Sequence, residues 1–121
     1  MKEFILVFLG GGLGSSLRYL VSLIFQNKGL VGGFPLATLF VNILGSFIIG
    51  MGLAYIGNNS THCLRYFLVV GFCGGFTTFS TFSFEALQLL RSSNYTYLAL
   101  YLLISIIACI AMTYLGYKAL S

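Results

Sequence analysis

The chain has 121 residues, of which 59% are hydrophobic and only 7% are charged, and its mean hydropathy is +1.00. This composition excludes an ordinary soluble globular domain and indicates an integral membrane protein. The formal net charge is +4, but the Lys and Arg side chains are scattered singly along the sequence. Without a basic cluster, nucleic acid is not an expected partner.

Four apolar segments are long enough to cross a bilayer, which takes about 20 residues each. We expect them at residues 4–25, 36–56, 63–90 and 95–117, joined by short polar connectors. They use nearly the whole sequence and leave no room for a soluble domain. The sequence therefore predicts an all-α membrane protein, with residues 1–121 forming a single four-helix transmembrane domain in the lipid bilayer.

The first span contains a small-residue motif and a cation. Gly10 and Gly14 form a G-x-x-x-G motif, which mediates close helix packing more often than it binds phosphate. Arg18 follows on the same helix, and an Arg in an apolar span is costly and a functional candidate. It is close enough to the helix end to snorkel to the membrane surface. Structural anchoring therefore stands beside a role in anion attraction or in interface assembly.

The second span carries polar and small residues on one helical face, namely Thr38, Asn42, Gly45 and Ser46. Asn42 is the most unusual of these. Its amide can donate a hydrogen bond to an anion without a charge that would trap the ion. The alternative is an interhelical hydrogen bond, which intramembrane Asn residues commonly form, and Asn42 taken alone favours that alternative.

The third span is interrupted by a polar stretch from Gly71 to Glu85, which includes the pair Gly74-Gly75, small hydroxyl side chains and one carboxylate. Irregular backbone at membrane depth is tolerated only against protein, ions or a water-lined cavity. We therefore expect two half-helices joined by a break near Gly74-Gly75, and an ion pathway is the first hypothesis. Glu85 is the only acid inside a span.

Phe79 and Phe82 lie one turn apart in this stretch and can project into one cavity. The positive edge of an aromatic ring can contact a small anion weakly, although a single Phe in a membrane helix usually serves packing. Ser80 and Thr81 lie between them and supply hydroxyl donors.

The fourth span has a polar stripe in which every fourth residue is Tyr101, Ser105, Cys109 or Thr113. Such a stripe can hydrate a pathway, and the alternative is that its hydroxyls bond back to their own helix. The sequence assembles no catalytic dyad, metal cluster or nucleophile with its base, so we do not expect an enzyme.

The cationic residues give little preference for one orientation in the membrane. Lys2, Arg65 and Lys118 fall on one side, whereas Lys28 and Arg91 fall on the other, with Arg18 buried or near it. Because an excess of Lys and Arg sets orientation, we expect the chain to insert both ways up. Four helices make a thin wall for a pore, so an antiparallel, dual-topology homodimer is the expected architecture.

Three segments together resemble the Fluc (CrcB) fluoride-channel family in order and spacing: Gly10 to Tyr19, Thr38 to Phe47, and Gly71 to Phe82. The resemblance extends over all four spans, and the Gly-Gly-x-Thr-Thr-Phe-Ser-Thr-Phe string is highly specific. It implies passive, fluoride-selective efflux that confers fluoride resistance, from the inner (plasma) membrane. It further implies a dual-topology homodimer with two antiparallel pores and one structural sodium ion on the dimer axis.

The resemblance also implies roles for individual residues. Asn42 would be the pore amide, Phe79 and Phe82 the aromatic pair contacting fluoride, and the backbone carbonyls of Gly74 and Thr77 the sodium ligands. Further candidates for the fluoride pore are Thr38, Ser80, Thr81, Tyr101, Ser105 and Thr113. Cys109 stands where a hydroxyl is expected, so that either Cys109 or Thr113 completes the polar track.

The main alternative is a small four-helix drug exporter coupled to protons. That class needs an acid embedded in the membrane. Glu3 is too close to the terminus for this role, and Glu85 does not lie on the expected first helix. A non-transporting assembly subunit is a third reading, but it leaves the broken third span unexplained.

Overall fold

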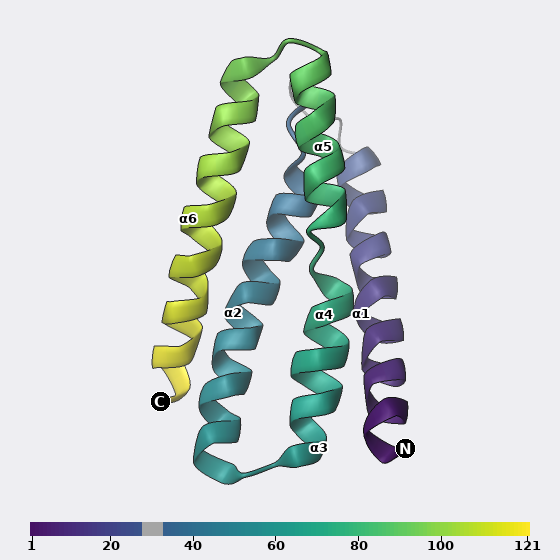
Figure 1. Cartoon of the computed structure of the whole chain (residues 1–121), viewed down its shortest axis with the longest axis vertical. Coiled ribbons are helices and arrows are strands. Elements are labelled where there is room, and N and C mark those ends of the chain that lie inside the picture. Colours follow the sequence, from purple (N-terminus) through teal and green to yellow (C-terminus); the bar gives the residue numbers. More distant parts are fainter. Residues whose placement is uncertain (28–32) are drawn as a thin grey trace.

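The computed structural model describes residues 1–27 and 33–121, and these are almost entirely helical (Figure 1). Lys28, which enters the charge count above, lies outside the described residues. The expectation of four membrane-capable helices is confirmed. The elements in chain order are α1 (Lys2–Asn27), α2 (Leu36–Asn59), α3 (His62–Leu64), η2 (Arg65–Cys73), α4 (Gly74–Phe76), α5 (Ser80–Arg91) and α6 (Tyr95–Leu120).

Tight connectors join α2 to the third span and the third span to α6, so these neighbours are antiparallel. Helix α2 is capped by Ser60, the residue after its end, whose backbone is left-handed (φ 51°) and whose N–H donates to the Ile56 carbonyl. Helix α6 begins after Asn94, whose side chain accepts a hydrogen bond from the Tyr97 N–H at 3.4 Å. Both termini therefore lie at the same end of the molecule (Figure 1).

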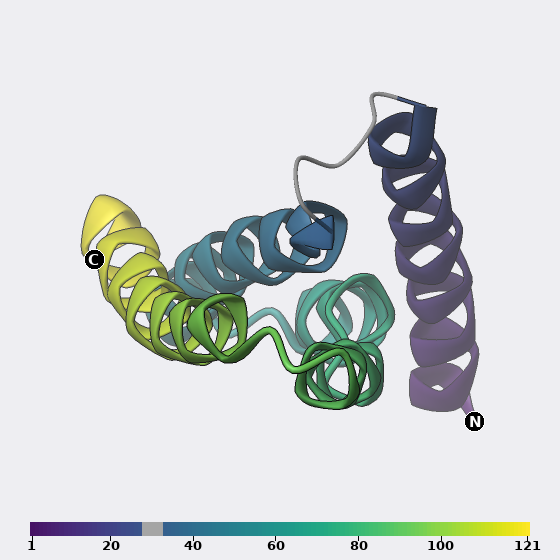
Figure 2. The ribbon, with the colours of Figure 1, turned by 90° about the horizontal axis from the view of Figure 1, so that it is seen from above.

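The helices pack closely in two groups: α2 packs on α6, and α1 packs on η2 and α4. Seen from above, α1 and α6 lie on opposite sides of the molecule, and α2 and the third span lie between them (Figure 2). The α1 pair depends on the G-x-x-x-G motif. A Cβ atom on Gly10 would lie 2.2 Å from the Phe67 carbonyl oxygen, and one on Gly14 would lie 2.2 Å from that of Phe72. The prediction that this motif serves close packing is thus confirmed.

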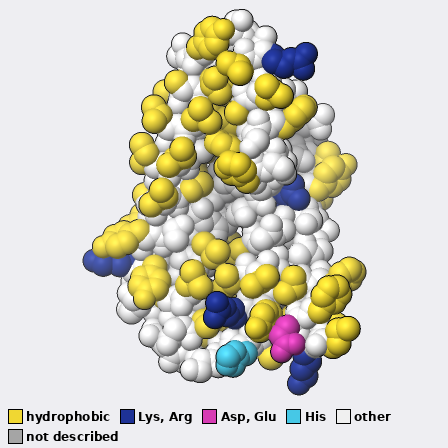
Figure 3. Space-filling model, viewed as in Figure 1, with side chains coloured by type: hydrophobic (Ala, Val, Ile, Leu, Met, Phe, Trp, Pro, Cys, Tyr) yellow, Lys and Arg dark blue, Asp and Glu magenta, His cyan; other side chains and the backbone are white. Residues whose placement is uncertain are grey.

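The protein interior is small, and large apolar side chains cover the outside (Figure 3). Fully buried side chains include Val41, Cys73 and Tyr101, whereas Phe8, Ile107 and many others are mostly exposed. A soluble monomer rarely exposes so much contiguous apolar surface. In the membrane, lipid or a partner protein must cover this apolar surface.

The third span is broken near Gly74-Gly75, as expected, but the glycines themselves are helical and the break begins two residues after them. Gly74 is helical (φ −62°, ψ −37°), and the non-helical segment runs from Thr77, which is extended (φ −87°, ψ 159°), to Phe79. Gly75 instead permits close packing on α1, since a Cβ there would lie 2.5 Å from the Gly11 carbonyl oxygen. Gly75 thus reflects helix contact, whereas a Cβ atom on Gly74 would meet nothing within 4 Å, and the hydroxyl residues that follow the glycines make the break.

Candidate functional site: a broken helix between two cavities

Asn42 on α2 is bonded to the peptide at the centre of the break. Its Nδ2 donates to the Thr78 carbonyl at 3.1 Å, and the Thr78 N–H donates to its Oδ1 at 2.9 Å. The amide thus replaces the backbone partners that Thr78 loses where the helix stops. The interhelical hydrogen bond considered as an alternative for Asn42 is therefore formed. Because a side-chain NH2 carries two hydrogens, a second donor remains for a ligand.

Hydroxyl side chains secure both ends of the break. Thr77 Oγ1 donates to the Cys73 carbonyl at 2.7 Å at the end of α4. Thr78 Oγ1 accepts from the Thr81 N–H at 3.2 Å, as a capping side chain does in the first turn of a helix, and it also bonds to the hydroxyls of Thr81 at 3.2 Å and Ser80 at 3.3 Å. Sequence reasoning did not single out Thr78, although its signal, a second Thr directly after Thr77, is present.

The larger of two cavities beside the break has a volume of about 560 Å³ and lies between α2, the third span and α6. Its wall is mostly apolar, and the polar groups in it are uncharged among the residues that the structure describes. The side chains that can offer a polar atom are those of Asn42, Ser46, Cys73, Thr77, Thr78, Ser105 and Cys109. This cavity can therefore solvate an ion with hydroxyl, thiol and amide groups without a fixed countercharge.

Phe79 and Phe82 both line this larger cavity, with ring centroids 5.5 Å apart. Phe82 also packs on Tyr101, with ring centroids 5.0 Å apart. Phe79, by contrast, is 78% exposed and projects from the edge of the molecule. Phe82 is therefore packed within the chain, whereas Phe79 is available to a partner.

The polar stripe on α6 divides into two parts. The hydroxyls of Tyr101 and Ser105 are buried and have no hydrogen-bond partner within residues 1–27 and 33–121. Such a group costs about 1–3 kcal/mol when unsatisfied, so water or an ion is expected there. Thr113 Oγ1 donates to the Cys109 carbonyl at 2.9 Å on its own helix, and it lies outside the residues that line the larger cavity, whereas Cys109 lies among them.

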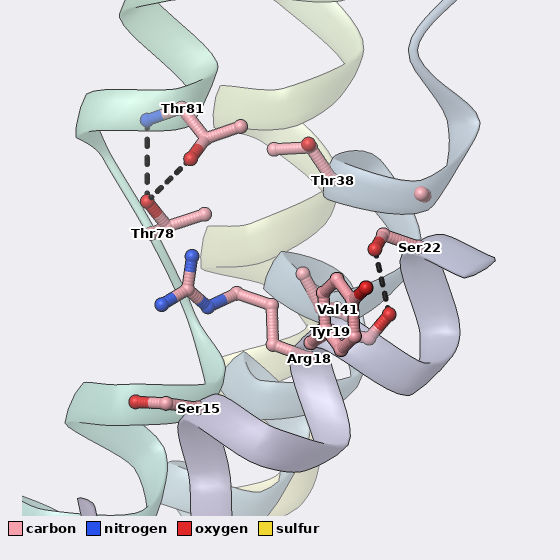
Figure 4. Close-up of a pocket in the computed structure, with 9 residues that line it drawn as sticks. Ser15, Arg18, Tyr19, Ser22, Thr38, Val41, Thr78 and Thr81 are labelled. Carbon is pink, nitrogen blue, oxygen red and sulfur yellow. Dashed lines mark hydrogen bonds between the residues drawn. The ribbon is translucent and has the colours of Figure 1, made fainter. Parts of the chain in front are cut away.

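The smaller cavity, of about 340 Å³, lies between α1, α2 and the break. Arg18 does not snorkel but reaches toward the break between Ser15 and Thr78 (Figure 4), where its Nε donates to the Gly75 carbonyl at 3.0 Å. The described residues provide no carboxylate partner for this guanidinium. Ser22, Thr38 and Thr81 add hydroxyls to the wall, of which Ser22 donates to the Tyr19 carbonyl and Thr38 to Glu85, so Arg18 is the cationic donor of this cavity among the described residues.

Thr38 lies on the other side of the break from the larger cavity. Its Oγ1 donates to the Glu85 carboxylate, and Thr38 is only 7% exposed. The polar face expected on α2 is thus divided between the two cavities. Thr38 lines the smaller one, and Asn42, Gly45 and Ser46 line the larger one. The sequence singled out Glu85 as the only intramembrane acid but did not show that Thr38 would satisfy it.

Three backbone carbonyls at the break, those of Gly74, Phe76 and Thr77, receive no hydrogen bond within the part of the chain that the structure describes. The Gly74 and Thr77 carbonyls lose their helical donors because the Thr78 N–H turns to Asn42 and the Thr81 N–H turns to the Thr78 hydroxyl. Among the same residues, no cluster of three His, Cys, Asp or Glu side chains could hold a metal ion. Any cation at the break would therefore be held by backbone oxygen.

Comparison with known proteins gives a consistent result over nearly the full chain. The family model described as CrcB-like protein, Camphor Resistance (CrcB), matches residues 5–117. A fluoride-specific ion channel FluC of Azobacteroides pseudotrichonymphae is 47% identical over 119 residues, which are 97% of this chain and 94% of the relative. Proteins of the same name from Methanococcus maripaludis (46% over 118 residues, 96% and 93%) and Phocaeicola vulgatus (44% over 121 residues, 96% and 96%) are similarly close.

Proposed function

Because this chain belongs to the CrcB family, whose relatives are named fluoride-specific ion channels, we propose that it is a fluoride-selective channel through which fluoride leaves the cell passively. It is a multi-pass protein of the plasma membrane and not an enzyme. The observation that carries the proposal is the larger cavity, whose wall offers several donors and no charge.

Fluoride holds its water tightly, so a selective pore must replace that water with other donors and remain too narrow for larger halides. The remaining Nδ2 hydrogen of Asn42 and the unpartnered hydroxyl of Ser105 are such donors in the larger cavity. The buried Tyr101, whose ring packs on Phe82, lies outside the residues that line it. The ring edges of Phe79 and Phe82 add weak contacts. Because the described residues place no fixed cation in this wall, the ion binds weakly enough to leave again.

The smaller cavity supports a second role for charge. The Arg18 guanidinium lies beside Thr78 and Thr81, where it raises the local concentration of anions without facing the larger cavity directly. Its hydrogen bond to Gly75 also stabilises the backbone that precedes the break. Thr38, Ser80 and Glu85 line or border this side, so we assign them to the approach to the pore.

We assign the functional unit as a homodimer of two copies in opposite orientations, with two pores. The single chain leaves Phe79 78% exposed beside an open cavity, and a second copy would cover it and complete the wall. The near balance of Lys and Arg between the two sides supports insertion both ways up.

A structural sodium ion at the dimer axis fits the break. Each chain brings carbonyls without donors, among them those of Gly74 and Thr77, and two crossing breaks would surround one point with oxygen atoms. An unsatisfied carbonyl at membrane depth is costly, and a dehydrated monovalent cation would satisfy it. If the site is structural, anomalous diffraction should find sodium there. Full activity after complete exchange of sodium for a large organic cation would exclude it.

Membership in this family decides against the proton-coupled drug exporter that the sequence left open. The hypothesis of a non-transporting assembly subunit gives no role to the larger cavity and its donors.

The proposal is tested by loading liposomes that contain the purified protein with either fluoride or chloride. We expect fluoride efflux as soon as an ionophore balances the charge, with no imposed proton gradient, and no measurable chloride efflux. Comparable flux of the two ions, or fluoride flux only with a proton gradient, would overturn it.

A further inference from the structure

Three cations that are far apart in the sequence lie at one end of the folded chain. Lys2 begins α1, Arg65 begins η2, and Lys118 lies in the last turn of α6. The start of α1, the α3 segment and the end of α6 all lie at the lower end of the molecule (Figure 1). Among the described residues, Arg91 is the cation at the opposite end. We call the end with Lys2, Arg65 and Lys118 the basic end.

The three charges form a ring around this end and not a single pocket. A Cβ atom on Gly10 would lie 2.2 Å from the Phe67 carbonyl oxygen, so these two residues lie at one level. At about 1.5 Å per residue, Arg65 lies about 3 Å and Lys2 about 12 Å nearer the end of the molecule than that level. Long cationic side chains can extend further toward water from such positions. The basic end therefore places its charges at and just inside the membrane surface.

These cations are exposed and have no counterion within the described residues. All three side chains are exposed. The ion pair that the described residues form joins the Met1 amine to Glu3 at 3.5 Å. Lys118 Nζ lies 5.7 Å from the centroid of the Tyr114 ring, and that ring is 58% exposed. Exposed Tyr beside a cation is typical of the membrane–water interface.

Exposed apolar side chains lie on the hydrocarbon side of two of these cations. Ile5 is 55% exposed and follows Lys2 by three residues, and Leu115 is 52% exposed and precedes Lys118 by three residues. Residues three apart share one face of a helix. An acidic peptide would neutralise the cations but leave these apolar side chains uncovered. A molecule with an anionic headgroup and acyl chains covers both.

We propose that the basic end binds anionic phospholipid. The headgroup phosphate contacts Lys2, Arg65 or Lys118, and the acyl chains lie along the apolar side chains of the same helices. A Lys or Arg near the membrane surface favours an anionic over a neutral headgroup by about fivefold. The proposal does not depend on fluoride conduction.

The chain contains no Trp, so Tyr114→Trp provides a single fluorescent reporter next to Lys118. Trp also keeps the aromatic face that the ammonium covers. The reporter protein is placed in bilayers in which either phosphatidylglycerol or phosphatidylcholine carries bromine, which quenches Trp on contact. We expect brominated phosphatidylglycerol to be preferred by about fivefold at low salt. The preference should decrease at high salt, because salt screens exposed charges.

Lys118→Gln in the reporter protein should remove most of this preference. Arg91→Gln, the same kind of change at the opposite end, is the matched control and should leave it unchanged. Equal quenching by the two lipids, or a preference that survives Lys118→Gln, would overturn the proposal.

Native mass spectrometry provides a second measurement that needs no reporter. The unmodified protein, extracted from an equal mixture of the two lipids, should retain more phosphatidylglycerol than phosphatidylcholine. The triple variant Lys2→Gln, Arg65→Gln, Lys118→Gln should lose this excess while keeping its melting temperature in detergent. An excess that is the same in the triple variant would contradict binding at the basic end.

Discussion

Replacing Asn42 by Asp keeps the shape of the side chain and exchanges its NH2 for a second carboxylate oxygen. That oxygen would face the Thr78 carbonyl across the 3.1 Å now bridged by a hydrogen bond, and loss of the bond costs about 1–3 kcal/mol. The new charge also repels an anion. At about 4 Å and an effective dielectric constant near 20, the repulsion is about 4 kcal/mol.

Since about 1.4 kcal/mol corresponds to a factor of about ten, fluoride occupancy beside residue 42 should fall by about a thousandfold. The Thr78 N–H keeps its acceptor, so the variant should still assemble. Fluoride efflux from liposomes measures conduction, and size-exclusion chromatography measures assembly. Asn58→Asp, the same change at an exposed position of the same helix, is the matched control and should conduct normally. Unchanged fluoride flux in Asn42→Asp would refute a place for Asn42 in the pathway.

Three further predictions concern the rings, the helix packing and the orientation. Phe79→Ile and Phe82→Ile keep apolar bulk but lose the polarised ring edge, so each should reduce fluoride efflux strongly, and normal flux in both would leave the rings with packing alone. Gly14→Ala places a methyl group 2.2 Å from the Phe72 carbonyl oxygen and should destabilise the folded protein by at least about 1–3 kcal/mol, measured as a lower melting temperature in detergent, while Gly57→Ala, where the added atom meets nothing within 4 Å, should not. Asn59→Cys in a chain without other cysteines should be labelled from outside intact cells in about half of the molecules, and labelling of nearly all or none would contradict dual topology.

The sequence predicted the helices well because hydrophobic length dictates membrane spans. The positions of the helix ends depended on local groups such as Ser60 and Asn94, which a polar connector already indicates. The break was located less accurately. Glycine weakens a helix, but Gly75 is small because α1 packs directly on it, and periodicity within one span cannot show which neighbour approaches it.

For the candidate site, the sequence indicated which residues are unusual but not which residues they contact. Asn42, Phe79 and Phe82 were recognisable as unusual residues, and the structure brings them to one cavity. Their partners were not recognisable, because Thr78 and the Thr38 bond to Glu85 depend on how α2 crosses the third span. Thr113 illustrates the converse, since its hydroxyl is already bonded within its own helix.

The most direct test of the central claim is the reversal potential of the purified protein in a planar bilayer, with a tenfold fluoride gradient and equal chloride on both sides. A passive, fluoride-selective pore predicts a reversal potential of about 59 mV in the direction set by fluoride alone, the value for one charge and a tenfold ratio. The value should not change when a proton gradient is added. A reversal potential near zero, or one that shifts with the proton gradient, would contradict a passive fluoride channel.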